Sequence, residues 1–173
     1  MIPTPYLLFL GDAPDQLSAK VAQGIKDWRP ENAVGQIRMP GCNADLGLED
    51  LTLEQAYEKG ARTMVIGVAN RGGYISEAWK AVLIEALSTG LDLASGLHNL
   101  LRDEPDLVAN AKQYGRLLHD VRVPTVEYPI ANGKTRKGKR CLAVGTDCSA
   151  GKMYTAMAMD RLMQERGMKS TFR

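Results

Sequence analysis

The sequence predicts an α/β protein: a Rossmann-like domain with a parallel sheet, followed by the first strand, loop and helix of a P-loop domain. Two observations support this prediction. Short apolar runs alternate with amphipathic stretches along most of the chain, and a glycine-rich loop follows an apolar run near its end. We expect the Rossmann-like domain over residues 1–127, a linker over 128–140 and an incomplete P-loop domain over 141–173.

The first elements follow from the spacing of apolar residues. A buried strand is expected over residues 6–10, ahead of Gly11 and Asp12. In the next stretch Leu17, Val21, Ile25 and Trp28 recur at helical spacing and predict the buried face of a helix. Further strands are expected over residues 34–38, 63–68, 91–94 and 117–121, and further helices near residues 53–60, 76–90 and 105–114.

The helix expected after residue 76 has the clearest boundaries. Ser76 is a candidate N-cap, and Gly90 is a terminator at which the chain can leave the helix. Its predicted buried face consists of Trp79, Val82, Leu83, Ala86 and Leu87.

Composition argues against several classes of protein. Lys and Arg number 22 against 20 Asp and Glu, a net charge of +2, so a global basic field for nucleic acid is lacking. No apolar run approaches the roughly 20 residues of a membrane helix. Three cysteines without CxxC spacing and two histidines argue against zinc and favour reduced thiols in the cytoplasm. We expect a small-molecule substrate; a homo-oligomer is compatible with the sequence.

The composition changes in the stretch between residues 128 and 140. Five basic residues lie there among turn residues, which is typical of a solvated linker or of a strip that contacts phosphate. The basic residues are Lys134, Arg136, Lys137, Lys139 and Arg140.

After the linker we expect a strand over residues 141–144, a helix from about residue 151, and a strand over 168–172. The predicted buried face of that helix is Thr155, Ala158, Met159, Leu162 and Met163. One strand and one helix bury little surface, so we expect either that the chain is the N-terminal part of a longer protein or that this segment packs on the first domain.

The strongest chemical signal is a stretch that matches G-x-x-x-x-G-K after an apolar run and before a helix. Glycines let successive N–H groups point at phosphate oxygens, and the helix N-terminus and a lysine add positive charge. The alternative is a glycine-rich turn without a ligand. The predicted cofactor-binding residues are Gly145, Thr146, Asp147, Cys148, Ser149, Ala150, Gly151, Lys152 and Met153.

Met153 departs from this motif, because it replaces the Ser or Thr whose hydroxyl binds magnesium. A thioether is a poor ligand for a hard cation, which disfavours ordinary Mg-ATP hydrolysis. Asp147, or Thr155 in a shifted register, remains as a metal ligand. Otherwise the loop binds the phosphates of a carrier that is not cleaved there, such as coenzyme A. A nucleophilic role for Cys148 is a weaker hypothesis.

Two further loops follow expected strands, at the carboxyl edge where open α/β sheets bind ligands. His98 is a candidate general base, with a purely structural role as the alternative, and His119 is interpreted as structural. Gly72 and Gly73, ahead of a capped helix, are a candidate anion site, and Arg71 is a candidate partner for a carboxylate. The predicted substrate-binding residues are Asn70, Arg71, Gly72, Gly73, Ser95, Gly96 and Asn99.

Four separated motifs, in order, resemble the DgcN family of bacterial proteins, and the resemblance covers essentially the whole chain. The motifs are residues 6–12 (YLLFLGD), the loop Asn70…Gly72-Gly73, residues 94–98 (ASGLH) and residues 145–153 (GTDCSAGKM). Members of this family look like D-glutamate N-acetyltransferases with a Rossmann-like N-terminal domain and a P-loop C-terminal domain. They run to roughly twice this length.

The resemblance implies transfer of an acetyl group from acetyl-CoA to the amine of D-glutamate, with residues 145–153 at the coenzyme A phosphates. The loops at 70–73 and 95–99 would face the glutamate or the acyl group. The choice of His98 as catalytic base is an inference from the residue, not from the resemblance. Two alternatives stay open: a Mg-ATP-dependent enzyme similar to dethiobiotin synthetase, and a non-catalytic module that binds a nucleotide or coenzyme A.

Overall fold

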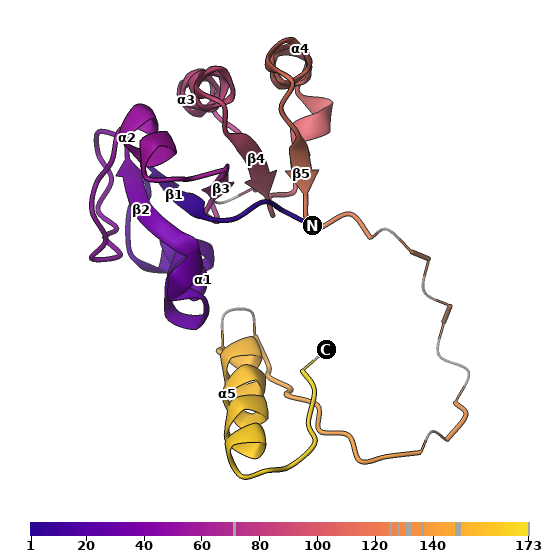
Figure 1. Cartoon of the computed structure of the whole chain (residues 1–173). Coiled ribbons are helices and arrows are strands. Elements are labelled where there is room, and N and C mark those ends of the chain that lie inside the picture. Colours follow the sequence, from indigo (N-terminus) through magenta and orange to yellow (C-terminus); the bar gives the residue numbers. More distant parts are fainter. Residues whose placement is uncertain are drawn as a thin grey trace. The chain divides into compact units, whose positions relative to one another are not determined.

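The computed structural model describes residues 1–70, 72–124, 126–127, 129–130, 133–135, 137–147 and 150–172. The chain divides into two compact units, Met1–Glu127 and Tyr128–Arg173, which are described separately (Figure 1). None of the helices in the described part of the chain is long and apolar enough to cross a membrane.

The first unit is built on a sheet of five parallel strands, as the alternating pattern predicts. The strand order is β2-β1-β3-β4-β5, so the order reverses between β1 and β3. Because all strands are parallel, the loops after them meet at one edge of the sheet. The strands are β1 (Tyr6–Gly11), β2 (Ala33–Arg38), β3 (Thr63–Ile66), β4 (Asp92–Ser95) and β5 (Leu118–Asp120).

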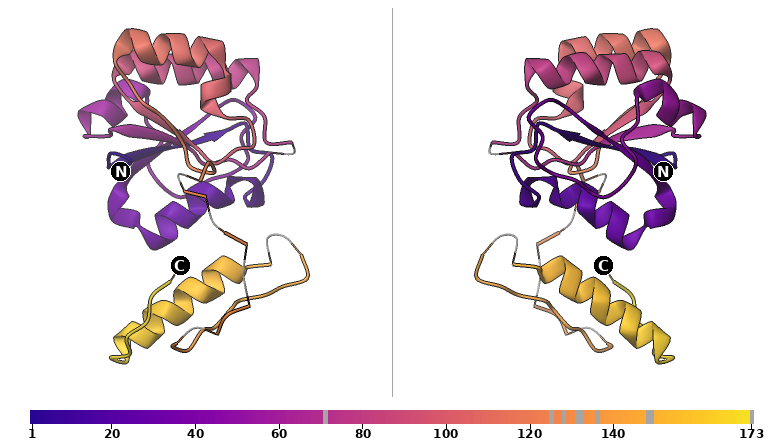
Figure 2. Two further views of the ribbon diagram at one scale, coloured as in Figure 1. Left: turned by 90° about the vertical axis from the view of Figure 1, so that its right-hand side faces the viewer. Right: turned by 90° about the vertical axis from the view of Figure 1, so that its left-hand side faces the viewer.

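Helices cover both faces of this sheet. In Figure 2, α1 lies on one face, whereas α3 and α4 lie side by side on the other. This arrangement is the one that right-handed crossovers produce when the strand order reverses after β2. The α-helices of the unit are α1 (Lys20–Trp28), α2 (Leu53–Glu58), α3 (Glu77–Thr89) and α4 (Pro105–Tyr114), and the short 3-10 helices are η1 (Leu17–Ala19), η2 (Pro30–Asn32) and η3 (Leu101–Asp103).

The boundaries predicted for α3 are confirmed. The Ser76 hydroxyl accepts a hydrogen bond from the amide of Trp79 at 3.2 Å, and Gly90 ends the helix in the left-handed conformation with φ of 106°. Four of the five residues predicted for its inner face are buried, and the fifth, Val82, is half-buried. The helix therefore begins and ends where the sequence places it.

The buried face predicted for α1 is wrong in its first half, whereas Ile25 and Trp28 are half-buried and Ile25 packs against the core. Leu17 is 63% exposed and Val21 is 39% exposed, whereas Ala19 and Ala22 are completely buried. The cause is the close approach of α1 to the strand below it: a Cβ atom built on Gly67 would lie 2.3 Å from the Cβ of Ala22. At this separation only small side chains fit between the helix and the strand, so the larger apolar residues turn outward.

Backbone hydrogen bonds close the point at which the strand order reverses. The amide of Ala22 donates to the carbonyl of Gly67 at 3.1 Å, and the amide of Ala69 donates to the carbonyl of Ser18 at 2.7 Å. The amide of Gly67 in turn donates to the carbonyl of Phe9 at 2.9 Å. The amide of Ala22 near the start of α1 is therefore bound within the protein and is not available to a ligand.

In the second unit the predicted helix forms as α5 (Lys152–Glu165), but both predicted strands are wrong. Residues 141–144 are not a strand, and Leu142 and Val144 are 82% and 78% exposed. Residues 168–172 are not a strand either. A strand needs a neighbour to pair with its backbone, and the described part of this unit contains none. No residue of α5 is buried, because the described part of this unit contains no sheet on which the helix can pack. Its predicted buried face is therefore also wrong.

Because α1 lies so close to β3, we expect that a methyl group added at Gly67 destabilises the first unit. Gly67→Ala should lower the free energy of unfolding of the first unit by about 1–3 kcal/mol, because the added Cβ overlaps Ala22. The measurement is urea denaturation followed by tryptophan fluorescence, since both tryptophans, Trp28 and Trp79, belong to this unit.

Gly96→Ala is the matched control, because its added Cβ would meet only the Val121 side chain at an ordinary 3.5 Å. This control should change the unfolding free energy by no more than about 1 kcal/mol. Equal effects of the two substitutions would contradict the close-approach argument.

Candidate functional site

The loops that follow β3 and β4 are in direct contact. The amide of Asn99 donates to the carbonyl of Gly73 at 2.9 Å. A Cβ atom at Gly73 would lie 2.8 Å from Cδ2 of His98 and 2.9 Å from its backbone nitrogen, and Gly73 has φ of +62°. Both the space and the backbone conformation therefore require glycine. The structure thus brings together Gly73, His98 and Asn99, three of the residues singled out in the sequence.

Charged side chains behind the second loop hold it in place. The Asn99 side-chain amide lies 3.5 Å from Glu104, which forms an ion pair with Lys80 of α3 at 2.9 Å. Hydrogen bonds from Lys80 to Glu77 and Glu104 raise the pKa of the lysine above its ordinary value. On the other side, the almost completely buried Asp120 accepts a hydrogen bond from the amide of Leu101 at 2.7 Å.

Two of the predicted substrate-binding side chains are engaged in holding these loops. The buried Ser95 hydroxyl accepts from the amide of Leu97 at 3.1 Å. The Asn70 side chain donates to the carbonyl of Tyr74 at 2.8 Å, and the backbone carbonyl of Asn70 accepts from the amide of Gly73 at 3.2 Å. The Gly73 amide is therefore not available as the anion donor that the sequence suggests. The buried side-chain oxygen of Asn70, Oδ1, has no hydrogen-bond partner among the described residues.

The other predicted residues of these loops differ in exposure. Gly72, His98 and Asn99 are exposed at the carboxyl edge of the sheet, and Gly96 is half-buried. Arg71 lies outside the described residues.

His119 pairs with Asp92, its Nε2 lying 3.4 Å from the carboxylate. Asp92 is the first residue of β4, so this pair lies away from the carboxyl edge. Asp92 also accepts from the amide of Leu117 at 3.0 Å, which gives it a role in pairing the two strands.

The glycine-rich loop of the second unit closes on its lysine. Gly151 precedes α5 in the left-handed conformation with φ of 81°, and Lys152 is the first residue of the helix. The ammonium group of Lys152 donates to the backbone carbonyl of Asp147. A Cβ atom at Gly145 would lie 3.2 Å from the aliphatic stem of Lys152, so the lysine folds back over the start of the loop. The N-terminus of α5 and the ammonium group of Lys152 therefore both lie at this loop.

The residues beside this lysine bear on the question of a metal. Met153 is 56% exposed next to the loop and carries no hydroxyl group. The exposed Thr155 follows, its amide bonded to the carbonyl of Gly151 at 2.9 Å. Across the residues that the structure describes, no three His, Cys, Asp or Glu side chains lie together as metal ligands. Cys148 and Ser149 lie outside the described residues, as does Arg136 of the basic stretch; the other four basic residues of that stretch are exposed.

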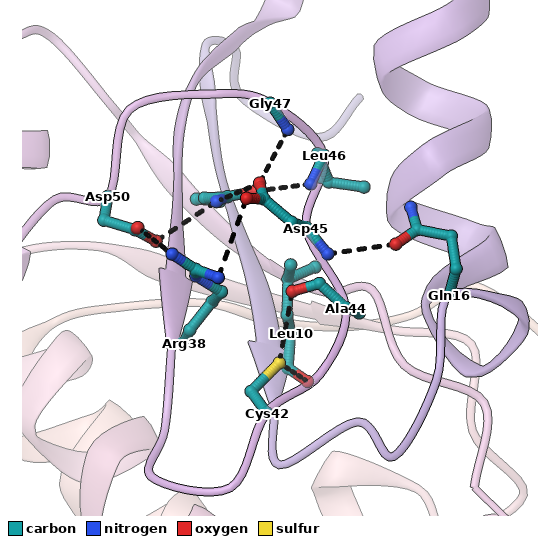
Figure 3. A network of polar contacts seen from close by, with 10 residues as sticks. Leu10, Gln16, Arg38, Cys42, Ala44, Asp45, Leu46, Gly47 and Asp50 are labelled. Carbon is teal, nitrogen blue, oxygen red and sulfur yellow. Dashed lines mark hydrogen bonds and ion pairs between the residues drawn. The ribbon is translucent and has the colours of Figure 1, made fainter.

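The sequence analysis missed a polar network beside β2, drawn in Figure 3. The completely buried Gln36 donates to Asp45 at 2.9 Å and to Asp50 at 3.1 Å, and its carbonyl oxygen accepts from the amide of Leu46 at 2.8 Å. Arg38 binds Asp50 through two nitrogens, one of them at 2.8 Å. In the sequence the signal of this network is the pair of polar residues Gln36 and Arg38, two positions apart in an otherwise apolar strand.

The charged groups of the network are two carboxylates, Asp45 and Asp50, both paired with the guanidinium group of Arg38. Hydrogen bonding to Arg38 holds the pKa of Asp50 below its ordinary value, and hydrogen bonding to the amide of Gly47 does the same for Asp45. A groove of about 500 Å³ lies beside it, lined by Ile37, Arg38, Met39, Pro40, Cys42, Asp50, Leu51, Thr52 and Gln55. Because these polar groups already bind one another, the network fixes the segment after β2 to the sheet and is not a candidate for chemistry.

Fold and loops together define a class: a Rossmann-like α/β unit followed by a segment with a phosphate-binding loop. The chain belongs to the DUF1611 family. Residues 38–124 match its Rossmann-like domain (DUF1611_N), and residues 129–173 match its P-loop domain (DUF1611_C), both described as domains of unknown function. The family to which the sequence motifs pointed is therefore confirmed in its two-domain organisation.

Two curated relatives match the whole of the chain. A protein from Tritonibacter scottomollicae is 73% identical over 173 residues, which are 100% of this chain and 52% of the relative. A protein from a Pseudoalteromonas species is 42% identical over 172 residues, 99% of this chain and 52% of the relative. Both are named D-glutamate N-acetyltransferase. The chain spans about half the length of these relatives.

A solved structure has the same fold. The crystal structure of a DUF1611 family protein from Anabaena variabilis superposes with a TM-score of 0.76 at 28% sequence identity. The match covers 95% of this chain and 50% of that one.

The geometry of the glycine-rich loop predicts that Lys152 binds phosphate. Lys152→Ala should weaken the binding of coenzyme A about 10- to 100-fold, because a charge-assisted hydrogen bond to phosphate is lost. The measurement is isothermal titration calorimetry. Lys169→Ala, which removes an exposed lysine in the same unit, is the control and should bind like the unchanged chain. Equal affinity of the Lys152→Ala variant and the unchanged chain would contradict the assignment.

Proposed function

We propose that this chain belongs to an enzyme that transfers an acetyl group from acetyl-CoA to the amine of D-glutamate. The observation that carries the proposal is the 73% identity, over all 173 residues, to a protein named D-glutamate N-acetyltransferase. The second relative carries the same name at 42% identity. The cytoplasm is the proposed location, because Cys42 and Cys141 are free thiols and such groups persist in a reducing compartment.

The residues of the glycine-rich loop suit the phosphates of coenzyme A. Lys152 supplies a positive charge, and the N-terminus of α5 supplies backbone N–H groups and the positive end of its dipole. Gly145 leaves room for the lysine stem to cross the loop. A thioether at Met153 fits this role, since a carrier whose phosphates are only held needs no magnesium ligand there. In this proposal the loop binds the phosphates of coenzyme A, and the acetyl group reacts at another place.

The acceptor is proposed to bind at the loops after β3 and β4. Gly72 is exposed, as are His98 and Asn99, and among the described residues the buried Oδ1 of Asn70 is an acceptor without a partner. Open α/β sheets bind ligands at this edge. Arg71, whose sequence position lies between Asn70 and Gly72, is the proposed partner of a carboxylate of the substrate.

The reaction needs a neutral amine, a base and donors for the oxyanion. The neutral amine nitrogen forms a bond to the thioester carbonyl carbon and the C–S bond breaks. The second proton lost by the nitrogen passes to the departing sulfur, so coenzyme A leaves as the thiol. His98 is the proposed base, which takes the proton from the ammonium group before attack. Backbone N–H groups of the glycine loops, other than that of Gly73, are the proposed donors to the oxyanion.

The central test is product formation without ATP. The protein, expressed at the full length of its gene, is mixed with acetyl-CoA and D-glutamate and should yield N-acetyl-D-glutamate, detected by mass spectrometry. L-glutamate in a parallel reaction should give much less product. Product that requires Mg-ATP would instead favour the enzyme of dethiobiotin-synthetase type, and tight binding of coenzyme A with no product would favour the binding module.

His98→Ala, measured in the same assay, separates the base from the binding loops. Because His98 is proposed to accept a proton, this variant should lose about 100- to 10,000-fold in turnover while its affinity for coenzyme A stays unchanged. Full turnover would remove His98 from the mechanism without affecting the proposed reaction.

A further inference from the structure

Asp12 is an exposed carboxylate at the carboxyl end of β1, the strand beside which the strand order reverses. It belongs to the same edge of the sheet as the loops after β3 and β4, because all five strands are parallel. Neither the proposed donor site nor the proposed base uses this side chain. Its surroundings show that its orientation is set by the fold.

The orientation of Asp12 comes from a buried tryptophan of α3. The indole nitrogen of Trp79 donates to Oδ1 of Asp12 at 2.8 Å, and Trp79 is only 2% exposed. The indole ring packs edge-to-face on Phe9, with ring centroids 5.4 Å apart and an interplanar angle of 83°. A ring held in this way gives the carboxylate a fixed direction.

Gly11 is part of the same arrangement. It has φ of +52°, and a Cβ atom built on it would lie 2.8–2.9 Å from three atoms of the Trp79 ring. A side chain at this position would push the indole away from Asp12. Position 11 therefore requires a glycine, so that the indole ring can pack against it. Position 12 requires a carboxylate, which accepts the indole N–H.

The other buried or capping carboxylates of this edge are already in use for structure. Asp15 accepts from the amide and the hydroxyl of Ser18 at 2.8 and 2.9 Å, and these hydrogen bonds, that to the amide first, lower its pKa. Asp120 accepts from the backbone of η3. Asp12 accepts no backbone N–H among the described residues, and its contact there is the indole alone. The other carboxylate oxygen, Oδ2, has no hydrogen-bond partner among the described residues.

A continuous segment links Asp12 to the proposed acceptor loops. Residues 73–79 contact His98 through Gly73 at their beginning and bind Asp12 through Trp79 at their end. In the sheet, β1 and β4 are separated only by β3, so the ends of these two strands lie about 10 Å apart. One small ligand is therefore long enough to lie between the ends of these two strands.

We propose that Asp12 binds the ammonium group of the amino-acid acceptor and orients it toward His98. This inference rests on the proposed function and adds a residue to it. A fixed carboxylate pairs with an ammonium group through charge-assisted hydrogen bonds. Asp12 accepts two of the three ammonium N–H donors, and the third faces His98, which removes that proton before the nitrogen attacks the thioester. Trp79 is a positioning residue that acts through Asp12.

The test compares two ligands that differ in the ammonium group. D-glutamate carries it, and glutarate has the same two carboxylates without it. Calorimetry on the 173-residue chain should show that Asp12→Asn weakens D-glutamate binding about 10- to 100-fold and leaves glutarate binding unchanged. Asp27→Asn, which removes an exposed carboxylate near the end of α1 and away from these loops, should leave both affinities unchanged.

Trp79→Phe tests the positioning role. It keeps an aromatic ring against Gly11 and removes the indole N–H, so D-glutamate binding should weaken about 3- to 10-fold and glutarate binding should not change. Thermal unfolding of each variant separates this effect from a loss of folded protein. A Trp79→Phe variant that is folded and binds D-glutamate like the unchanged chain would contradict the positioning role.

The outcomes also separate this inference from the proposed function. If the unchanged chain binds D-glutamate and Asp12→Asn binds it equally well, the ammonium site is wrong and the proposed reaction stands. Equal weakening of both ligands would overturn the ammonium site as well, because glutarate has nothing for Asp12 to bind. If the unchanged chain binds neither ligand, both the acceptor site proposed here and the role of Asp12 are overturned.

Discussion

The close approach of α1 to β3 at Gly67 is the constraint on which the arrangement of the first unit depends. It brings the backbone of Ala22 within hydrogen-bonding distance of Gly67, so the amide of Ala22 near the start of α1 is bound within the protein. Along the same edge of the sheet, Gly73 allows the loops after β3 and β4 to touch. The exposed residues of the candidate acceptor site, Gly72, His98 and Asn99, lie on these loops.

Local signals sufficed for the elements whose ends are fixed by their own residues. Ser76 and Gly90 bound α3, and α4 occupies the predicted 105–114. The inner face of α1 was mispredicted, because periodicity favours large apolar residues and the close contact at Gly67 admits only alanine. A distance between a helix and a strand that is set by a glycine some 45 residues away is not visible in a helical repeat.

The second unit shows that an apolar run in the sequence does not by itself determine a strand. Residues 141–144 have the composition of a buried strand, yet Leu142 and Val144 are exposed, because a strand depends on a partner and not on its own sequence. In the candidate site, Gly72, Gly73, His98 and Asn99 were identified from their positions after apolar runs. Asp12 was not, since its importance derives from Trp79, which approaches it from 67 positions along the chain.

The account divides two substrates between two parts of one chain: phosphates of the donor at the loop of Lys152, and the amino acid at the loops after β3 and β4. Nuclear magnetic resonance of the ¹⁵N-labelled chain, titrated separately with coenzyme A and with D-glutamate, tests this division most directly. The account predicts that coenzyme A shifts amide signals of residues 145–153, and that D-glutamate shifts those of Asp12, Gly72, His98 and Asn99. Shifts from both ligands in the same loop, or D-glutamate shifts confined to the glycine-rich loop, would contradict it.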